Sequence, residues 1–244
     1  MSTYVLIHGA WHGGWCWEKV VPLLERAGHK VEAPDLPGHG DDTTPTREVS
    51  LKAYVDRVCG ILDAESEPVV LVGHSMGGIV ITQAAEYRPA RIRTLVYVAA
   101  FLLRNGESLV EVAQTDTNAL VMPNLVMSED QTHATVGDGK IKEAFYGDCS
   151  DQDVARAKSL LVPQALAPFA TPMTTTEENF GRVPRLYVEC LGDRAISPSV
   201  QKTMYTATPC PKVISMNTSH SPFFSAPEEL ASHLTSFDLS LTAR

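Results

Sequence analysis

The chain has 244 residues, of which 44% are hydrophobic and 20% charged, and its 20 basic and 29 acidic side chains give a formal charge of −9. This composition excludes disordered, collagen-like and disulfide-scaffold chains. The acidic balance argues against a nucleic-acid partner and against an anionic membrane surface, because both need clustered Lys and Arg. The length fits one large α/β domain, or one such domain with an insertion.

The first residues and the cysteines indicate the cellular compartment of the protein. A predicted strand over 4–7 follows Met1 almost directly, so no secretory leader is expected. No apolar run approaches the roughly 20 residues that span a bilayer. No C-x-x-C pair occurs among the scattered cysteines, which are Cys16, Cys59, Cys149, Cys190 and Cys210. We therefore expect a cytoplasmic protein without membrane association, whose reduced thiols pack as small apolar side chains.

Strand-like and helix-like segments alternate over the first hundred residues. Apolar runs predict strands over 4–8 and 30–33, and apolar residues at helical spacing predict a helix over 15–27. Ser50 is the expected N-cap of a helix with apolar positions from Leu51 to Leu62. The continuous apolar run over 68–72 predicts a parallel strand that is buried on both faces. A helix over 76–87 and a buried strand over 93–100 follow.

The alternation stops between about residues 102 and 181, where the apolar positions suit helices better than strands. It resumes with a strand over 185–191, a helix near 199–206, a strand over 212–216 and a closing helix over 227–237. Alternating strands and helices predict an α/β protein with a doubly wound, mostly parallel sheet. We therefore predict a core of residues 1–101 and 182–244, with residues 102–181 inserted as a helical cap over one edge of the sheet.

The strongest local signal is a G-x-S-x-G pattern, Gly73-His74-Ser75-Met76-Gly77. A serine at a sharp strand-to-helix turn is exposed at the tip of the turn, at the positive end of a helix, and small neighbours allow the turn to close. Here the pattern follows a predicted strand and precedes a predicted helix, which is the context the chemistry requires. Ser75 is therefore the predicted nucleophile. The alternative, an N-cap serine at an ordinary turn, leaves the flanking glycines unexplained.

A serine nucleophile needs a base, and the base needs a carboxylate that orients it. The residue order for such a site is Ser, acid, His, so the base should follow the last strand, where His220 lies. Asp193 follows the strand over 185–191 and is the predicted acid, although it could also be an exposed turn residue without a role. His39 is better explained as a loop-fixing residue, and His74 should point away from the tip.

The oxyanion of the reaction intermediate needs two backbone N–H donors. One is expected from Met76, the residue after the nucleophile, and the other from the loop after the first strand. There Gly9 allows a close approach and makes Ala10 the predicted donor. Trp11 in this loop either binds substrate or packs against the core or the cap. No metal-ligand spacing and no nucleotide-binding loop occurs in the sequence, so we expect neither a metal nor a cofactor.

Several segments carry a resemblance to a known family. They are His8-Gly9-Ala10-Trp11-His12-Gly13-Gly14-Trp15-Cys16-Trp17, Val72–Gly78, Tyr97–Phe101, Phe180–Arg185 and the stretch from Asp193 to His220. They resemble the α/β-hydrolase group of plant methyl esterases and hydroxynitrile lyases and its bacterial esterase relatives, including pyrethroid-hydrolase-like esterases. The likeness covers nearly the whole chain. It implies the α/β-hydrolase fold, a triad of Ser75, Asp193 and His220, and an oxyanion hole at Ala10 and Met76.

Two departures from this group bear on the reaction. Plant lyases carry a threonine where this chain has Gly9 and a lysine where it has Ser221. Those residues bind the cyanohydrin hydroxyl and the departing cyanide, so their absence favours ester hydrolysis. The loop Asp35-Leu36-Pro37-Gly38-His39-Gly40 has the general α/β-hydrolase form and disfavours plant-hormone substrates. We predict a serine carboxylesterase that acts on small to medium, largely apolar carboxylic esters through an acyl-enzyme.

Two alternatives stay open: a hydroxynitrile or other C–C lyase on the same triad, and a catalytically weak ligand-binding protein. Epoxide hydrolase and dehalogenase activities are disfavoured, because they need Asp where this chain has Ser75. The expected partner is a small ester, and a homodimer stays open because family members are often dimers. The predicted pocket is apolar, and about half of the following side chains should line it: Trp11, Leu102, Met122, Leu125, Phe145, Leu160, Leu161, Phe169, Met173 and Phe223.

Overall fold

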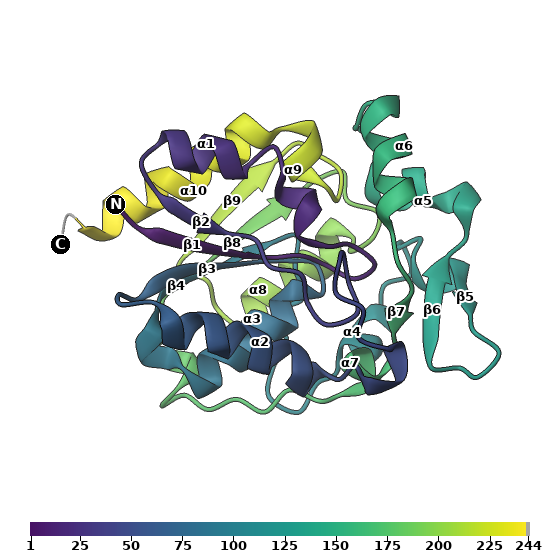
Figure 1. The fold of residues 1–244 in the computed structure, drawn as a ribbon, viewed down its shortest axis with the longest axis horizontal. Coiled ribbons are helices and arrows are strands. Elements are labelled where there is room, and N and C mark those ends of the chain that lie inside the picture. The colour runs from purple at the N-terminus through teal and green to yellow at the C-terminus, as the bar shows by residue number, and fades with distance from the viewer. Residues whose placement is uncertain (243–244) are drawn as a thin grey trace.

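A six-stranded parallel sheet forms the centre of the molecule in a computed structural model that describes residues 1–242, with side chains described as far as residue 236 (Figure 1). The strand order is β2-β1-β3-β4-β8-β9. Their bounds are β1 Thr3–Ile7, β2 Lys30–Glu32, β3 Val69–His74, β4 Ile92–Val98, β8 Arg185–Cys190 and β9 Lys212–Met216. Every neighbouring pair is parallel, which confirms the predicted sheet.

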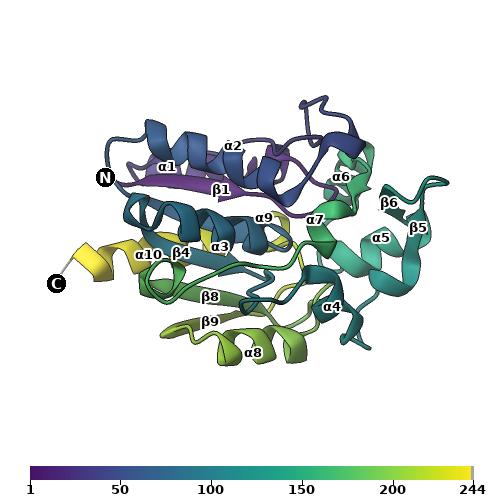
Figure 2. The ribbon, with the colours of Figure 1, turned by 90° about the horizontal axis from the view of Figure 1, so that it is seen from below.

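Helices cover both faces of this sheet (Figures 1 and 2). One face carries α1 (Val21–Arg26) and α10 (Pro227–Thr242), and the other carries α2 (Leu51–Ala64), α3 (Gly77–Tyr87) and α8 (Pro198–Ala207). The double cover leaves all six residues of β3 buried, which explains the continuous apolar run in the sequence. Among the described helices, none has the length and apolar character needed to cross a membrane.

Local signals in the sequence explain where the core helices begin. The Ser50 side chain accepts a hydrogen bond from the backbone N–H of Ala53 at 3.1 Å, which confirms the predicted N-cap of α2. The predicted helix over 15–27 is instead divided into a 3₁₀ turn, Gly14–Trp17, and α1. Pro22 in the first turn of α1 accounts for the division, because proline lacks an N–H and suits the start of a helix rather than its interior.

Residues 102–181 contain helices and also a second sheet. The helices are α4 (Leu109–Gln114), α5 (Asp138–Phe145), α6 (Asp151–Leu160) and α7 (Ala167–Ala170). The antiparallel sheet consists of β5 (Leu125–Met127), β6 (His133–Val136) and β7 (Gln164–Ala165). The predicted helices are present, and the strands of the second sheet were not predicted. Strands of two to four residues are too short to show a two-residue period in sequence.

This segment, called the cap below, lies beside the carboxyl ends of β1, β3, β4 and β8 rather than over a lateral edge of the sheet (Figure 1). In parallel sheets the loops at the carboxyl ends of the strands form the ligand-binding crevice. The cap therefore lies next to the loops that follow β1, β3 and β8, which contain most of the predicted site residues.

All five cysteines are free thiols, and Cys210 alone among them is half-buried while the others are buried. Four of the five thiols therefore pack in the interior, as predicted. Burial raises the pKa of Cys149 and of Cys210 to about 12, so both remain protonated at neutral pH.

Candidate active site

Ser75 lies on the turn between β3 and α3 in a left-handed backbone conformation, with φ at +54°. Non-glycine residues rarely adopt this conformation. The glycines around it are required by space. A Cβ on Gly73 would lie 2.7 Å from the backbone oxygen of Gly77, and one on Gly78 would lie 2.2 Å from that of Phe101. The turn can therefore close only with this spacing of glycines, and it presents the serine side chain at its tip.

His220 and Asp193 lie on the loops after β9 and β8, and the fold brings their side chains together. The distance from His220 Nδ1 to Asp193 Oδ2 is 2.8 Å, and both side chains are buried. Asp193 also accepts hydrogen bonds from the backbone N–H of Ala195 and Ile196 at 2.7 and 3.0 Å, and from Gln201 Nε2 at 2.9 Å. A carboxylate at Nδ1 selects the imidazole tautomer with Nδ1–H, so Nε2 is the basic position.

His74 connects the turn at Ser75 to the loop that carries His220. Its Nε2–H donates to the backbone oxygen of His220 at 2.8 Å, and the two rings lie 4.5 Å apart. Its side chain lines no part of the pocket that contains Ser75, in agreement with the expectation that it points away from the tip. Burial holds the pKa of His74 well below its usual value, so this ring is neutral and serves as a hydrogen-bond donor.

The loop after β1 packs directly against the serine turn. A Cβ on Gly9 would lie 2.7 Å from Ser75 Cβ, so only glycine allows this approach. Ala10 and Met76 line the same pocket as Ser75. Both residues lie outside the helices and strands, and within residues 1–242 no backbone hydrogen bond uses either N–H group. Two unpaired donors in an apolar pocket are suited to a developing negative charge.

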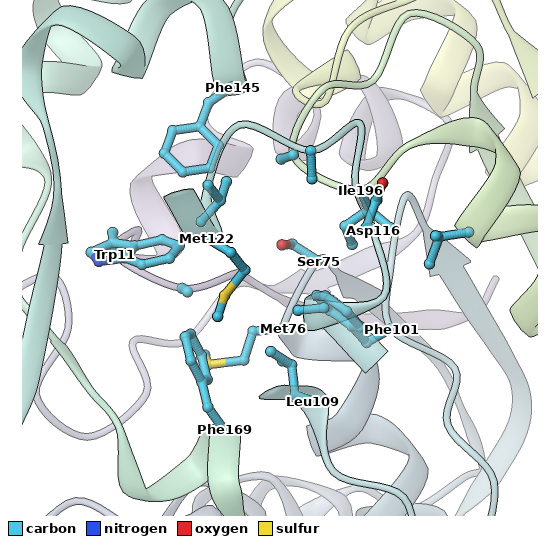
Figure 3. A pocket seen from close by; sticks show the side chains of 16 residues that line it. Trp11, Ser75, Met76, Phe101, Leu109, Asp116, Met122, Phe145, Phe169 and Ile196 are labelled. Atoms are coloured by element: carbon cyan, nitrogen blue, oxygen red, sulfur yellow. The ribbon is translucent and has the colours of Figure 1, made fainter. Parts of the chain in front are cut away.

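Sixteen residues line this pocket, and Figure 3 shows the Ser75 hydroxyl pointing into the space between them (Figure 3). Seven belong to the predicted site: Ala10, Trp11, Ser75, Met76, Met122, Phe145 and Phe169. All but Asp116 of the lining side chains are uncharged. The structure thus brings the nucleophile candidate, both amide candidates and four predicted cap or loop side chains to one pocket.

The other predicted lining residues lie elsewhere. Leu102, Met173 and Phe223 are almost completely buried in the core, and Phe223 packs against Trp17 at 5.4 Å between ring centres. Leu161 lines a second hollow, to which Trp11 and Phe145 also contribute. Leu125 and Leu160 are partly buried and line neither space. Composition alone could not separate pocket residues from the packing of the cap, because both are apolar.

Nine lining residues were not predicted: Phe101, Leu109, Ala113, Asp116, Ala119, Val121, Ala195, Ile196 and Val200. A signal existed for two of them, since residues 109 and 113 are spaced by four and so share one face of α4. The Asp116 carboxylate accepts from the backbone N–H of Ser197 at 2.7 Å and of Asn118 at 3.2 Å. It therefore fixes the loop after β8 as well as lining the pocket.

A buried polar network joins the cap to the loop after β1. Gln164 of β7 accepts from the backbone N–H of Trp11 at 3.3 Å and lies 2.9 Å from His39 Nε2. Its amide group donates to the Tyr54 hydroxyl at 3.1 Å. Trp11 also donates from Nε1 to the backbone oxygen of Ala134 at 2.9 Å. These bonds hold Trp11 with φ at +64°, and they give His39 the loop-fixing position expected of it.

Burial lowers the pKa of several histidines near the site. The pKa of His8 lies well below its usual value and that of His12 is lowered to about 4, because both rings are buried. These rings are therefore neutral hydrogen-bonding groups at pH 7. Among the residues that the structure describes, no three His, Cys, Asp or Glu side chains lie together so as to hold a metal ion.

In sequence and in structure, this chain is similar to known hydrolases. A family model described as the alpha/beta hydrolase family matches residues 4–233. The pyrethroid hydrolase of Sphingobium wenxiniae is 34% identical, over 97% of this chain and 88% of that protein. Putative methylesterase 11, chloroplastic, of Arabidopsis thaliana is 33% identical over 94% of this chain, which spans 62% of that longer protein. A crystal structure of a pyrethroid hydrolase from Sphingobium faniae aligns with a TM-score of 0.87 and 30% identity, covering 97% and 96% of the two chains.

Proposed function

The chain belongs to the alpha/beta hydrolase family and is a carboxylic-ester hydrolase, and we propose that Ser75, His220 and Asp193 act as its catalytic triad. The observation that carries the proposal is the buried His220–Asp193 pair, at 2.8 Å, beside a serine on a strained turn. His74, the residue before Ser75, bonds the main chain of His220, so the loop of the base is held next to the turn of the nucleophile.

The first half of the reaction forms an acyl-enzyme. Ser75 Oγ attacks the ester carbonyl carbon while His220 Nε2 takes the hydroxyl proton. The tetrahedral intermediate collapses, the bond from the carbonyl carbon to the alcohol oxygen breaks, and the imidazolium returns its proton to the departing alcohol. Asp193 stabilises the imidazolium while it exists and keeps the ring in the productive tautomer.

The second half releases the acid. A water molecule gives a proton to His220 and attacks the acyl carbon, and Ser75 leaves with the proton that His220 then returns. In both halves the oxyanion is bound by the backbone N–H groups of Ala10 and Met76, which form no backbone hydrogen bond within residues 1–242. Loss of one such donor costs about 10²–10³ in kcat in other serine hydrolases, so these two amides supply a large share of the rate.

The substrate class follows from the pocket wall. Side chains such as Trp11, Met122, Phe145 and Phe169 offer apolar contact, and the single carboxylate, on Asp116, is already bound to two backbone N–H groups. We propose small to medium, largely apolar esters, with residues 102–181 acting as the cap that encloses the acyl group. The names of the relatives, a pyrethroid hydrolase and a plant methylesterase, are those of proteins that act on esters.

A lyase on the same triad is the second candidate, and two positions disfavour it. At residue 9 any Cβ would lie 2.7 Å from Ser75 Cβ, so the threonine of the plant lyases does not fit this turn. Residue 221 is a completely buried serine whose hydroxyl has no hydrogen-bond partner among the described residues, and it offers no ammonium group for a departing cyanide.

Hydrolysis of a p-nitrophenyl ester series from acetate to palmitate tests the proposed function, with Ser75→Ala as the control. We expect hydrolysis to favour the short and medium esters and to fall by about 10⁴-fold or more in the variant. Equal rates for the two proteins would refute the role of Ser75. Mandelonitrile is assayed in parallel, and cyanide release that exceeds ester hydrolysis would favour the lyase instead.

A further inference from the structure

One turn of the cap contacts two of the loops that the proposed reaction uses. This turn, residues 146–149, joins α5 to α6 and is called the clamp turn here. Its Tyr146 hydroxyl lies 2.6 Å from His12 Nε2, in the loop after β1. Its Asp148 carboxylate accepts from the backbone N–H of Ser219 at 2.9 Å and also from the Ser219 hydroxyl, next to His220. Segments far apart in sequence are thus joined at one point.

The bond from Tyr146 determines how His12 supports the oxyanion loop. His12 Nδ1 lies 2.7 Å from the backbone oxygen of Ala10, which can only accept, so Nδ1 carries the proton and Nε2 accepts from the Tyr146 hydroxyl. His12 is buried and neutral, so it has one proton to place. The tyrosine hydroxyl holds that proton on Nδ1, where it fixes the Ala10 carbonyl and, through it, the residue whose N–H is the proposed oxyanion donor.

Asp148 holds the other side of the site in a similar way. Its carboxylate binds the main chain and the side chain of Ser219, the residue immediately before His220. The Sγ atom of Cys149 lies 3.9 Å from the backbone oxygen of Ser221, the residue immediately after His220. The clamp turn therefore contacts the main chain on both sides of the catalytic-base candidate.

We propose that the clamp turn is a positioning element, in which Tyr146 sets the Ala10 amide through His12 and Asp148 sets His220 through Ser219. The inference rests on the proposed function, because it assigns roles relative to that triad and oxyanion hole. Neither Tyr146 nor Asp148 lines the pocket, so both act through other residues rather than on the substrate. Small displacements of catalytic groups lower kcat while leaving substrate binding almost unchanged.

Tyr146→Phe is the central test, because it removes the hydroxyl and keeps the buried ring. The chain offers a matched control in Tyr97 of β4, which is also completely buried and whose hydroxyl lies 2.7 Å from Thr82 Oγ1 of α3. We expect Tyr146→Phe to lower kcat/KM for p-nitrophenyl butyrate about tenfold, a fraction of the cost of losing a whole donor. Tyr97→Phe should stay within twofold of the wild type, and both variants should fold.

A trifluoromethyl ketone separates positioning from simple loss of stability. Its adduct with Ser75 carries an oxyanion, whereas the neutral acyl analogue butyramide does not. In Tyr146→Phe the inhibition constant of the ketone should rise about tenfold, in parallel with the loss in kcat/KM, while that of butyramide stays unchanged. A Tyr146→Phe protein that matches Tyr97→Phe in both measurements would overturn the inference. Equal weakening of ketone and butyramide would also overturn it, because that pattern indicates general damage.

Two further variants complete the test. His12→Asn should lower kcat/KM by itself. Adding Tyr146→Phe to it should lower kcat/KM no further if the tyrosine acts through the histidine, and additive losses would contradict this.

Asp148→Ala should lower kcat and shift the pH profile of kcat/KM. Asp130→Ala, which removes a carboxylate that binds Ser128 Oγ at 2.7 Å in the β5–β6 hairpin, should change neither. If Ser75→Ala retained activity, the proposed function would fail and not the clamp turn alone.

Discussion

The loops of the parallel sheet and the cap contribute differently to the site. The loops after β1, β3, β8 and β9 supply the candidate amides and the three triad candidates, each held by backbone constraints such as the left-handed φ of Ser75. The cap supplies half of the apolar side chains around the pocket, among them Met122, Phe145 and Phe169. The difference suggests that the sheet decides which reaction occurs, and that the cap decides which ester reaches it.

Gly9→Ala gives the largest expected effect on the sheet side of this comparison. The added methyl would lie 2.7 Å from Ser75 Cβ and 3.0 Å from His74 Nδ1, so the loop or the serine turn must move. We expect kcat to fall by about 10²-fold, since a displacement of about 1 Å is worth that much, and KM to change little.

Gly60→Ala is the matched control for this variant. Gly60 lies on α2, and a Cβ added there would have no atom within 4 Å. That protein should keep its activity and gain about 0.5–1 kcal/mol of stability in urea denaturation, because alanine suits a helix interior better than glycine. A Gly9→Ala enzyme as active as Gly60→Ala would show that the close approach of the loop is not needed.

Phe169→Ala tests the cap side and should change selectivity rather than chemistry. Phe169 lines the pocket and packs edge-on against Trp11, with 5.9 Å between the ring centres. Its removal enlarges the apolar space, so the ratio of kcat/KM for decanoate over acetate p-nitrophenyl esters should rise by about tenfold. The rate of acetate hydrolysis should fall only a few-fold. A uniform loss for all chain lengths would contradict the division between sheet and cap.

The last expected effect is on stability in mild acid rather than on activity, and it comes from the buried histidines of the sheet loops. In His8, His12 and His74 the folded-state pKa lies below the ordinary value of 6.5, and for His12 it is about 4. As the pH falls below about 6.5, these histidines therefore become protonated in the unfolded chain while they remain neutral in the folded chain. Their contribution to stability is complete above that pH and is lost on acidification toward pH 4, by up to about 1.4 kcal/mol per pH unit for each ring.

Urea denaturation between pH 7.5 and pH 4.5 measures this loss. His12→Asn should make the pH dependence shallower, because one of the buried rings is absent. An identical pH dependence for wild type and His12→Asn would contradict the protonation state that the clamp turn requires.

Sequence patterns predicted the sheet side well and the cap side poorly, for physical reasons. Parallel strands buried on both faces leave continuous apolar runs such as 69–72, and the serine turn requires glycines at fixed positions. Both constraints are local and visible in a single chain. Three-residue strands such as β5 leave no such pattern.

The contacts that join the cap to the sheet loops were not predictable from sequence for a related reason. Gln164 meets Trp11 across 153 positions, and Tyr146 meets His12 across 134. Nothing in the local sequence marks either residue, because each depends on the path of the chain between the partners. The same holds for the pocket, where Phe169 lines the space and Phe223 is buried in the core although both are single aromatic residues in apolar segments.

Covalent labelling by a fluorophosphonate is the most direct test of the triad. Phosphonylation requires a serine that is activated by its base and an oxyanion hole that receives the P–O group. We predict one adduct per chain, located on Ser75 by peptide mass spectrometry, and formed at least about 10²-fold more slowly in His220→Ala. An adduct on another residue, or equal labelling rates in the wild type and His220→Ala, would contradict the assignment of Ser75 and His220 as nucleophile and base.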